Sequence, residues 1–209
     1  LHRSGFVGIV GRPNVGKSTL LNHYLREKIA IVSPRPQTTR QRILGVLTRD
    51  DAQVIFLDSP GLYEPEHVLG RYMLEVAKAV LEEADVVVAM IDARNGLTAE
   101  DEQVFARLRQ SLKYPTGTGK RPVFLAINKS DAVRKPRLLP LLEACAKTGL
   151  FEECIPVSAL TGDQMGVLLD RIISRLPEGP LWYESGRPTD QTTRQRVSEL
   201  IREQVLLAT

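Results

Sequence analysis

Cysteine and histidine are both scarce in this sequence, with two cysteines and three histidines among 209 residues. Cys145 and Cys154 match no metal-binding spacing, and neither do the scattered His2, His23 and His67. Zinc and iron–sulfur sites depend on clustered Cys and His ligands, so neither kind of site is predicted. We expect the two thiols to be reduced and buried, and the histidines to lie at the surface.

Long apolar runs are also missing. No apolar stretch approaches the roughly 20 residues that a membrane-spanning helix needs. No signal-peptide pattern is visible near the first residues. We therefore expect a cytoplasmic protein. The composition, 43% hydrophobic and 25% charged, is that of an ordinary globular chain. The net charge of +3 is compatible with a nucleic-acid partner but does not predict one.

The strongest positive signal is the sequence GRPNVGKS at residues 11–18, a complete G-x-x-x-x-G-K-S phosphate-binding loop. A buried-strand pattern at residues 6–10 precedes it and a helical pattern follows it, which is the setting that this motif requires. Lys17 would reach the β- and γ-phosphates, and the Ser18 hydroxyl would bind Mg²⁺. The predicted phosphate-loop contacts are Asn14, Val15, Gly16, Lys17, Ser18 and Thr19.

A second motif, DSPG at residues 58–61, follows another apolar run. An acidic side chain at the end of a strand holds Mg²⁺ directly or through water, which is the role predicted for Asp58. The Gly61 N–H would approach a γ-phosphate, because glycine places no side chain in the way. These residues predict the metal side of a nucleoside triphosphate site.

Residues 128–131, with the sequence NKSD, distinguish guanine from adenine. The Asp131 carboxylate only accepts hydrogen bonds, and guanine offers two adjacent donors that adenine lacks. A buried Asp131 would therefore be left unpaired against adenine. A site built in this way binds guanine nucleotides and rejects adenine nucleotides strongly. Asn128 would tie this loop to the phosphate-binding loop, and the stem of Lys129 would lie over the base.

Ser158 and Ala159 form the fourth and weakest element, at the end of one more apolar run. They would complete the guanine pocket. Each of the four elements stands at the C-terminal end of a predicted strand, and that edge of an open α/β sheet is where ligands bind. Their agreement in order and setting predicts one guanine-nucleotide site.

Strand and helix patterns alternate, which predicts an α/β fold with helices on both faces of a mostly parallel six-stranded sheet. A short Asp50-Asp51 link between two strands predicts one antiparallel edge strand. The expected strands are 6–10, 43–49, 52–57, 85–91, 122–127 and 154–157, and the expected helices are 17–27, 67–83, 99–112, 136–148, 164–176 and 191 to about 207.

We expect residues 1–177 to form the main domain and residues 178–188 to form a linker. Thr189 and Asp190 are predicted to cap the last helix, in the segment 189–209. One helix cannot bury an apolar stripe alone, so this helix docks on the main domain, meets a partner, or belongs to a second domain. The stripe consists of Val197, Leu200, Ile201, Val205 and Leu206.

The sequence QTTRQR occurs twice, at residues 37–42 and 191–196. The two copies lie in different predicted settings, a loop before a strand and the start of a helix. We interpret the repeat as a coincidence. The alternative is mimicry, in which the last helix contacts what the first copy contacts.

Together these motifs resemble those of the Era family of small GTPases, which act in bacterial ribosome assembly. The resemblance covers essentially the whole chain and implies a P-loop GTPase domain followed by the first helix of a truncated KH-type RNA-binding domain. Nothing after Pro177 supplies the Gly-x-x-Gly loop of a KH domain. The distinguishing segments are 11–22, 36–40, 58–62, 176–180, 189–190 and 198–203.

The resemblance implies a GTP-hydrolysing switch with guanine nucleotide as its ligand. Its other partners would be the small ribosomal subunit and its rRNA, bound through the missing part of the KH domain, so this chain alone is expected to lack that binding. The resemblance alone suggests peripheral association with the inner face of the membrane, and we expect a monomer. Residues 33–42 and 59–72 would be the two switches, ordered by GTP and loosened after hydrolysis.

Magnesium ligation is likewise implied by the resemblance. Ser18 and Thr39 would bind Mg²⁺ directly, with Thr38 as the alternative to its neighbour, and Asp58 would act through the metal's water shell. The residues expected to take part in hydrolysis are Lys17, Thr39, Gly61 and Asn14.

Leu62 occupies the place where Ras-like enzymes have a water-positioning glutamine. Its apolar side chain cannot orient water, so we expect slow intrinsic hydrolysis, on the order of 10⁻⁴ to 10⁻² s⁻¹. In related GTPases with this substitution, K⁺ takes the arginine-finger position and is held by an asparagine of the phosphate-binding loop. Asn14 is at that place and is the predicted K⁺ ligand; otherwise it only hydrogen-bonds within the loop.

Two other functions remain open at this stage. One is a GDP-holding binding module that recruits partners with negligible turnover, which Leu62 and the missing domain favour. The other is a sibling GTPase for tRNA modification or ribosome assembly, which the segment 36–40 disfavours. An ATPase is not expected, because of Asp131.

Overall fold

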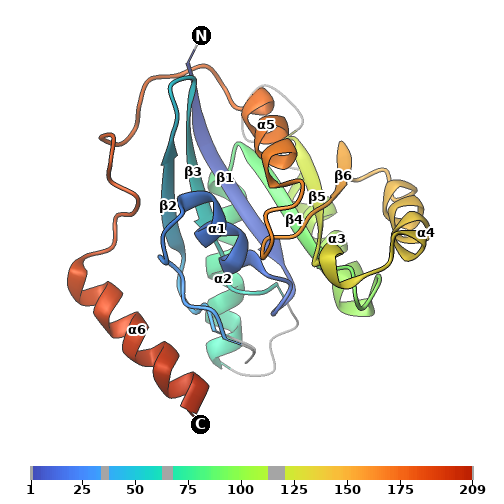
Figure 1. Ribbon diagram of the computed structural model, residues 1–209, viewed down its shortest axis with the longest axis horizontal. Coiled ribbons are helices and arrows are strands. Elements are labelled where there is room, and N and C mark those ends of the chain that lie inside the picture. The colour runs from blue at the N-terminus through green and yellow to red at the C-terminus, as the bar shows by residue number, and fades with distance from the viewer. Residues whose placement is uncertain (1, 34–37, 63–67, 113–120, 209) are drawn as a thin grey trace.

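The computed structural model describes residues 2–33, 38–62, 68–112 and 121–208. Within these ranges the chain forms one six-stranded sheet with helices on both faces, which confirms the predicted α/β fold (Figure 1). Parts of both predicted switches, at 34–37 and 63–67, lie outside the described residues, and so does Gln37 of the first repeat.

The strands follow the order β2-β3-β1-β4-β5-β6 across the sheet. All neighbours are parallel except β2 and β3, which the short link between them forces into an antiparallel hairpin. The apolar runs of β3, β4 and β5 are buried along their whole length, as expected for strands covered on both faces. The bounds are β1 (Arg3–Gly11), β2 (Ile43–Thr48), β3 (Ala52–Asp58), β4 (Val86–Asp92), β5 (Val123–Asn128) and β6 (Glu153–Pro156).

Two layers of helices cover the sheet. One face packs against α1 (Lys17–Leu25) and α5 (Met165–Arg175), and the other packs against α2 (Val68–Glu83), α3 (Ala99–Leu112) and α4 (Lys135–Ala146). The helix bounds lie within two residues of those predicted, because the helical spacing of apolar residues is a strong local signal. Among the described helices, none is both long enough and apolar enough to cross a membrane.

Strand β1 begins earlier than predicted, at Arg3 rather than residue 6. Arg3 and Ser4 are polar, so the apolar pattern in the sequence does not include the first residues of the strand. In the structure the pairing of β1 with β3 nevertheless begins at the Arg3–Ala52 pair. The Ser4 hydroxyl then donates to the Pro180 carbonyl at 2.7 Å, which fastens the linker to the start of the sheet.

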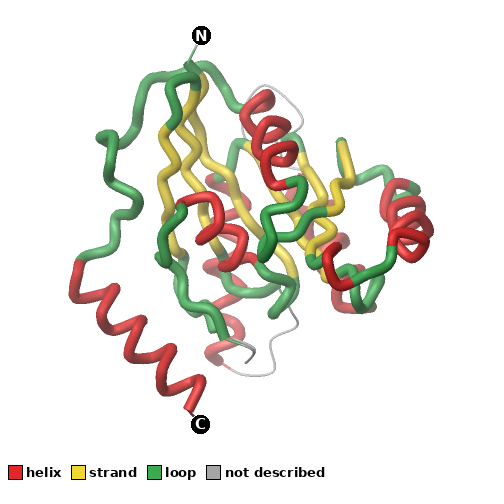
Figure 2. Tube along the Cα trace, viewed as in Figure 1, coloured by secondary structure: helices red, strands yellow, loops and turns green. Residues whose placement is uncertain are grey.

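The parallel strands bring their C-terminal ends to one edge of the sheet. Asp58 lies beside Ile9 of β1, and Asp92 of β4 lies beside Asn128 of β5. In Figure 2 these strands run side by side, and the loops that follow them gather at the same end. The sheet therefore brings together the motifs that the sequence separates.

The two cysteines are free thiols. Cys145 is buried, and burial raises the pKa of its thiol to about 12. Cys154 is half-buried rather than buried, and burial also raises the pKa of its thiol. His2 and His23 are half-buried, so they are less exposed than the expected surface position implies. His67 lies outside the described residues.

The predicted linker, residues 178–188, lies against the sheet. The Gln53 side chain of β3 is fully buried and accepts hydrogen bonds from the N–H groups of Trp182 and Tyr183, at 2.7 and 3.0 Å. It also donates to the Tyr183 carbonyl at 2.8 Å. The Trp182 ring meets Phe6 edge to face, with centroids 5.6 Å apart. The Gln53 side chain thus holds the middle of the linker against β3, in addition to the Ser4 and Phe6 contacts.

The predicted cap of the last helix is wrong. Helix α6 (Thr193–Ala208) is capped by Thr192, whose hydroxyl accepts from the Gln195 N–H at 3.3 Å, while the Gln195 side chain accepts from the Thr192 N–H at 2.8 Å. This is a reciprocal capping box. Thr189 is too far from the first turn to cap the helix, which begins at Thr193. Its hydroxyl instead donates to the Leu44 carbonyl of edge strand β2 at 2.7 Å and accepts from the Gln191 N–H at 3.3 Å.

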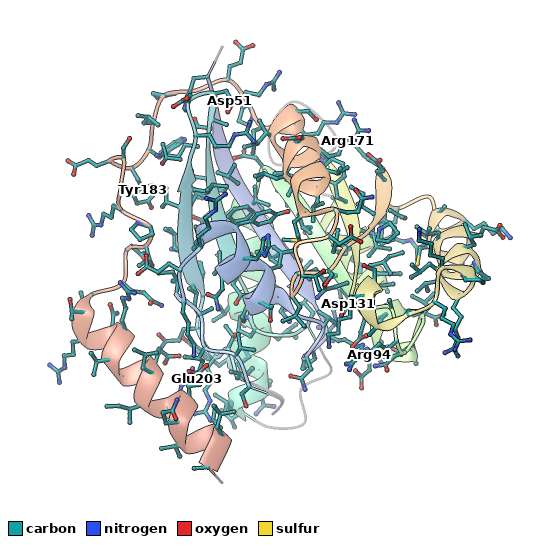
Figure 3. The ribbon with its side chains drawn as sticks, in the orientation of Figure 1. Asp51, Arg94, Asp131, Arg171, Tyr183 and Glu203 are labelled. Atoms are coloured by element: carbon teal, nitrogen blue, oxygen red, sulfur yellow. The ribbon has the colours of Figure 1, made fainter. Side chains whose placement is uncertain are left out.

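Helix α6 docks on the main domain through a buried carboxylate. Glu203 is 1% exposed, and its side chain accepts from the Val32 N–H at 3.0 Å. It also pairs with the Lys28 ammonium at 2.6 Å. Figure 3 labels Glu203 on the side of α6 that faces the rest of the chain. The contact joins the last helix to the segment that follows α1.

The apolar stripe of α6 does not make this contact. Val197 is 49% exposed, Leu200 45%, Ile201 61% and Val205 54%. Of the outcomes expected for this helix, docking on the main domain is therefore made by polar groups. Most of the apolar stripe is exposed, and Leu206 is half-buried.

We expect Glu203→Ala to loosen the docking of α6, because the change leaves the Val32 N–H and the Lys28 ammonium without their carboxylate, while the Arg196–Glu27 ion pair remains. Losing a hydrogen bond to a charged group costs about 1.5 to 3 kcal/mol. Amide hydrogen exchange in α6 should therefore accelerate, while exchange in the central strands stays unchanged. The matched control is Glu199→Ala, since Glu199 pairs with Arg202 within the same helix. Equal exchange in the two variants would contradict the docking role of Glu203.

Candidate nucleotide-binding site

A cavity of about 410 Å³ opens over the phosphate-binding loop at the C-terminal edge of the sheet. Its walls come from the loop after β1, the segment after α1 and the loops after β3, β4 and β5. The predicted site residues that line it are Asn14, Gly16, Lys17, Ser18, Thr19, Thr39, Gly61 and Lys129. The predicted site residues outside its lining are Val15, Asp58, Asn128, Asp131, Ser158 and Ala159.

Gly16 shows why the phosphate-binding loop needs glycine. Its φ of 104° is a conformation that side chains disfavour, and a Cβ there would lie 2.2 Å from the Asn128 amide nitrogen. Helix α1 begins at the next residue and has no acidic residue in its first turn. Its free N–H groups and positive end therefore face the cavity and suit an anion.

Lys17 is held inside the loop. Its ammonium donates to the carbonyls of Gly11 and Arg12, at 3.2 and 3.0 Å. Burial lowers the pKa of Lys17 to about 8, although the nearby Asp58 carboxylate opposes this shift. A phosphate group beside it would favour the charged form, so the buried ammonium suits an anionic ligand.

Ser18, Thr39 and Asp58 converge at one side of the cavity. The Ser18 hydroxyl donates to the Asp58 carboxylate at 2.7 Å and lies 3.1 Å from the Thr39 hydroxyl. Asp58 is fully buried, and burial raises its pKa to about 6 despite the nearby Lys17. Its Oδ1 is buried and has no hydrogen-bond partner among the described residues. Two hydroxyls and an incompletely paired carboxylate form an oxygen donor set that suits Mg²⁺.

Asn128 joins three loops. Its amide nitrogen donates to the Val15 carbonyl at 2.8 Å, and its amide oxygen accepts from the Ala159 N–H at 2.9 Å. Ser158 beside it is fully buried, and its hydroxyl accepts from the Thr161 N–H at 3.1 Å. The predicted tie between the NKSD loop and the phosphate-binding loop is present in the structure, and it extends to the Ser158-Ala159 element.

Lys129 crosses from the NKSD loop to the phosphate-binding loop. Its ammonium donates to the Asn14 carbonyl and to the Asp92 carboxylate, both at 2.7 Å. Asp131 lies in a short 3₁₀ helix, Ser130–Ala132, and is exposed rather than buried as expected. That helix sits at the rim of the site, so protein atoms do not cover its carboxylate.

Sequence reasoning missed Asp92 and Arg94. Asp92 is 1% exposed, and Arg94 lines the cavity. Burial alone would raise the pKa of Asp92, but hydrogen bonds from Arg94 and Lys129 lower it to about 2. The position of Asp92 in the sequence could have predicted its place at the site. It is the last residue of the apolar strand β4, just as Asp58 is the last residue of β3 and Asn128 of β5. Figure 3 shows Arg94 and Asp131 near the same end of the sheet.

Leu62 turns into the core and away from the phosphate-binding loop. It is 1% exposed and belongs to the apolar cluster that contains Ala77 and Leu81 of α2. Its N–H donates to the Gly11 carbonyl at 3.0 Å. Before it, Gly61 approaches so closely that a Cβ would lie 2.7 Å from the Pro13 nitrogen. The backbone at this position is therefore held against the phosphate-binding loop while the side chain packs elsewhere.

We expect Asn128→Ala to destabilise the site, because it leaves the Val15 carbonyl and the Ala159 N–H buried without partners. Each unsatisfied group costs about 1 to 3 kcal/mol, which urea unfolding would measure. Nucleotide affinity should fall as well, since the loops lose their common tie. The matched control is Ser130→Ala in the same motif, where the hydroxyl has no hydrogen-bond partner among the described residues. Equal unfolding midpoints for the two variants would refute this role.

The family model described as 50S ribosome-binding GTPase matches residues 6–129. GTPase Era of Alkaliphilus metalliredigens (strain QYMF) is 43% identical over 205 residues, which cover 98% of this chain and 67% of that relative.

Two solved structures are similar over almost all of the chain. One is Era in complex with MgGDPNP and nucleotides 1506–1542 of 16S ribosomal RNA, with a TM-score of 0.92, 41% identity and coverage of 100% of this chain and 68% of that one. The other is a tyrosine-to-alanine variant of Aquifex aeolicus Era bound to GDP and AlF4⁻, with a TM-score of 0.90, 41% identity and coverage of 99% and 68%. The chain spans about two thirds of the length of these relatives.

Proposed function

Because the chain belongs to the Era family of GTPases, we propose that the cavity over its phosphate-binding loop binds GTP and GDP and hydrolyses GTP. The observation that carries the proposal is that four loops, each following a strand, meet at one place. The loops after β1 and β6 hydrogen-bond to the side chain of Asn128, which ends β5. The loop after β3 lines the cavity beside it. Relatives with the same fold hold GDPNP with magnesium, or GDP with AlF4⁻.

We propose that the switch acts in assembly of the small ribosomal subunit. The support is the similar Era structure that contains part of 16S ribosomal RNA. In this proposal residues 1–177 are the GTPase domain, 178–188 the linker and 189–209 the start of a KH-type RNA-binding domain. The largely exposed apolar stripe of α6 supports the last assignment, since a second domain would cover it.

The magnesium site in this proposal uses Ser18 and Thr39 as direct ligands and Asp58 through water. Thr39 is preferred to Thr38, because the Thr39 hydroxyl lies 3.1 Å from that of Ser18. The unpartnered Oδ1 of Asp58 supports a cation on this side of the cavity. When bound, Mg²⁺ would neutralise charge on the β- and γ-phosphate oxygens.

Guanine recognition is assigned to Asp131, with Lys129 over the base. A guanine would cover the exposed Asp131 carboxylate and give it the two donors that it can accept. Asn128, Ser158 and Ala159 hold the loop beneath, and their mutual hydrogen bonds support that part. This arrangement discriminates against adenine.

Hydrolysis in this proposal depends on charge and position rather than on a water-orienting side chain. Lys17 and the Gly61 N–H would contact the γ-phosphate, and Thr39 would hold the metal that neutralises its charge. Leu62 packs in the core, which supports a route without a glutamine and a slow intrinsic rate. Asn14, which lines the cavity, is assigned to K⁺ in the place of an arginine finger.

A GDP-holding module with negligible turnover is the second candidate, because Leu62 supplies no polar group to the reaction. Multiple-turnover phosphate release separates the two functions. Release of several phosphates per chain supports the GTPase, whereas a single burst supports the module.

We expect GTP turnover to be faster in KCl than in NaCl at equal ionic strength, because K⁺ would stabilise charge in the transition state. Asn14→Ala should lose this difference while it still binds GDP, since its backbone carbonyl still accepts from Lys129. Phosphate release in both salts measures the effect. Unchanged K⁺ stimulation in the variant would remove Asn14 from this role, and equal turnover of the unmodified chain in both salts would remove K⁺ itself.

A further inference from the structure

One buried carboxylate at the nucleotide site has no part in the function proposed above. Asp92 ends β4, and its Oδ2 accepts from Lys129 at 2.7 Å and from Arg94 Nη2 at 2.8 Å. Its Oδ1 accepts from the Arg94 backbone N–H at 3.0 Å and from Arg94 Nε at 3.1 Å. The carboxylate therefore holds two cations from two different loops.

The position of this carboxylate is set by the sheet. Asp92 pairs in register with Asn128, the residue directly before Lys129. A group on a paired strand end moves less than a group on a loop, so Asp92 offers a fixed anchor. Lys129 itself has a φ of 64°, and this left-handed backbone conformation is uncommon for a residue with a long side chain.

The same ammonium also supports the phosphate-binding loop. Lys129 donates to the carbonyl of Asn14 at 2.7 Å, and Asn14 has a φ of 63°. Asparagine adopts this left-handed conformation more readily than most residues, and the contact from Lys129 supports it there. Asp92, Lys129 and Asn14 thus form a chain of contacts from the sheet to the phosphate-binding loop.

We propose that Asp92 is a positioning residue for guanine-nucleotide binding: its carboxylate holds the Lys129 ammonium on the Asn14 carbonyl, so that the stem of Lys129 lies across the face of the base. Arg94 fixes the carboxylate in that orientation through its backbone and side-chain donors. The inference rests on the proposed function, because it names how that site holds its ligand.

The inference separates two contributions to binding. Lys129 covers the face of the base, whereas Asp131 reads its edge. Inosine diphosphate has the same ring face as GDP but lacks the exocyclic amine that Asp131 would accept from. A defect in Asp92 should therefore weaken GDP and inosine diphosphate by the same factor, and a defect in Asp131 should change their ratio.

The test is calorimetric titration of the full chain with both nucleotides. Asp92→Asn keeps the shape of the side chain and removes its charge. We expect both dissociation constants to rise about tenfold, as for a lost hydrogen bond to a charged group, with their ratio unchanged. Asp92→Glu keeps the charge and should restore most of the affinity. The control Asp131→Asn should weaken GDP more than inosine diphosphate.

A double-mutant cycle tests whether Asp92 acts through Lys129. Lys129→Met with Asp92→Asn should cost little more than Lys129→Met alone, because the carboxylate then has no ammonium to hold. Additive losses would overturn the inference, and so would an unchanged GDP dissociation constant in Asp92→Asn. If Asp92→Asn does not fold, Lys129→Met carries the test, and a loss that differs between the two nucleotides overturns the inference. Failure of the unmodified chain to bind GDP would instead overturn the proposed function.

Discussion

The side-chain amide of Asn128 is the contact on which the nucleotide site depends. Strands β1 and β5 are not neighbours, because β4 lies between them, so no backbone ladder joins the loops that follow them. The buried amide makes this connection by donating to Val15 and accepting from Ala159. Gly16 lies so close to it that any side chain there would collide with it. The Asn128 side chain therefore holds the phosphate-binding loop and the NKSD loop together.

Two carboxylates at equivalent strand ends differ in their partners. Burial raises the pKa of Asp58 to about 6, because one hydroxyl and a nearby ammonium only partly compensate its charge. Burial acts on Asp92 in the same direction, but hydrogen bonds from two cationic side chains lower its pKa to about 2. Asp58 is thus suited to bind a cation that arrives with the nucleotide. Asp92 already pairs with two cationic side chains of the protein, Arg94 and Lys129. The same sheet edge therefore carries one carboxylate with few partners and one that is fully paired with cationic side chains.

The sequence predicts most of this fold, because the apolar runs of the strands and the spacing of the helices are local signals. It also predicts the motif loops, since parallel strands bring their ends to one edge. The exceptions depend on contacts between distant segments. Ser4 joins a strand because it pairs with β3 and hydrogen-bonds to the linker. Thr189 hydrogen-bonds to Leu44 of β2 and lies before the start of the helix, which Thr192 caps. Asp92 shows its role only through Lys129 and Arg94, which a linear pattern does not place beside it.

The function proposed for this chain requires that the four motif loops form one site specific for guanine nucleotides. Calorimetric titration of the chain with GDP and with ADP, in Mg²⁺ buffer, tests it most directly. We expect one GDP per chain and an affinity for GDP at least about a hundredfold greater than for ADP, since an acceptor-only carboxylate is left unpaired against adenine. Equal affinities for the two nucleotides, or no binding of GDP, would contradict it.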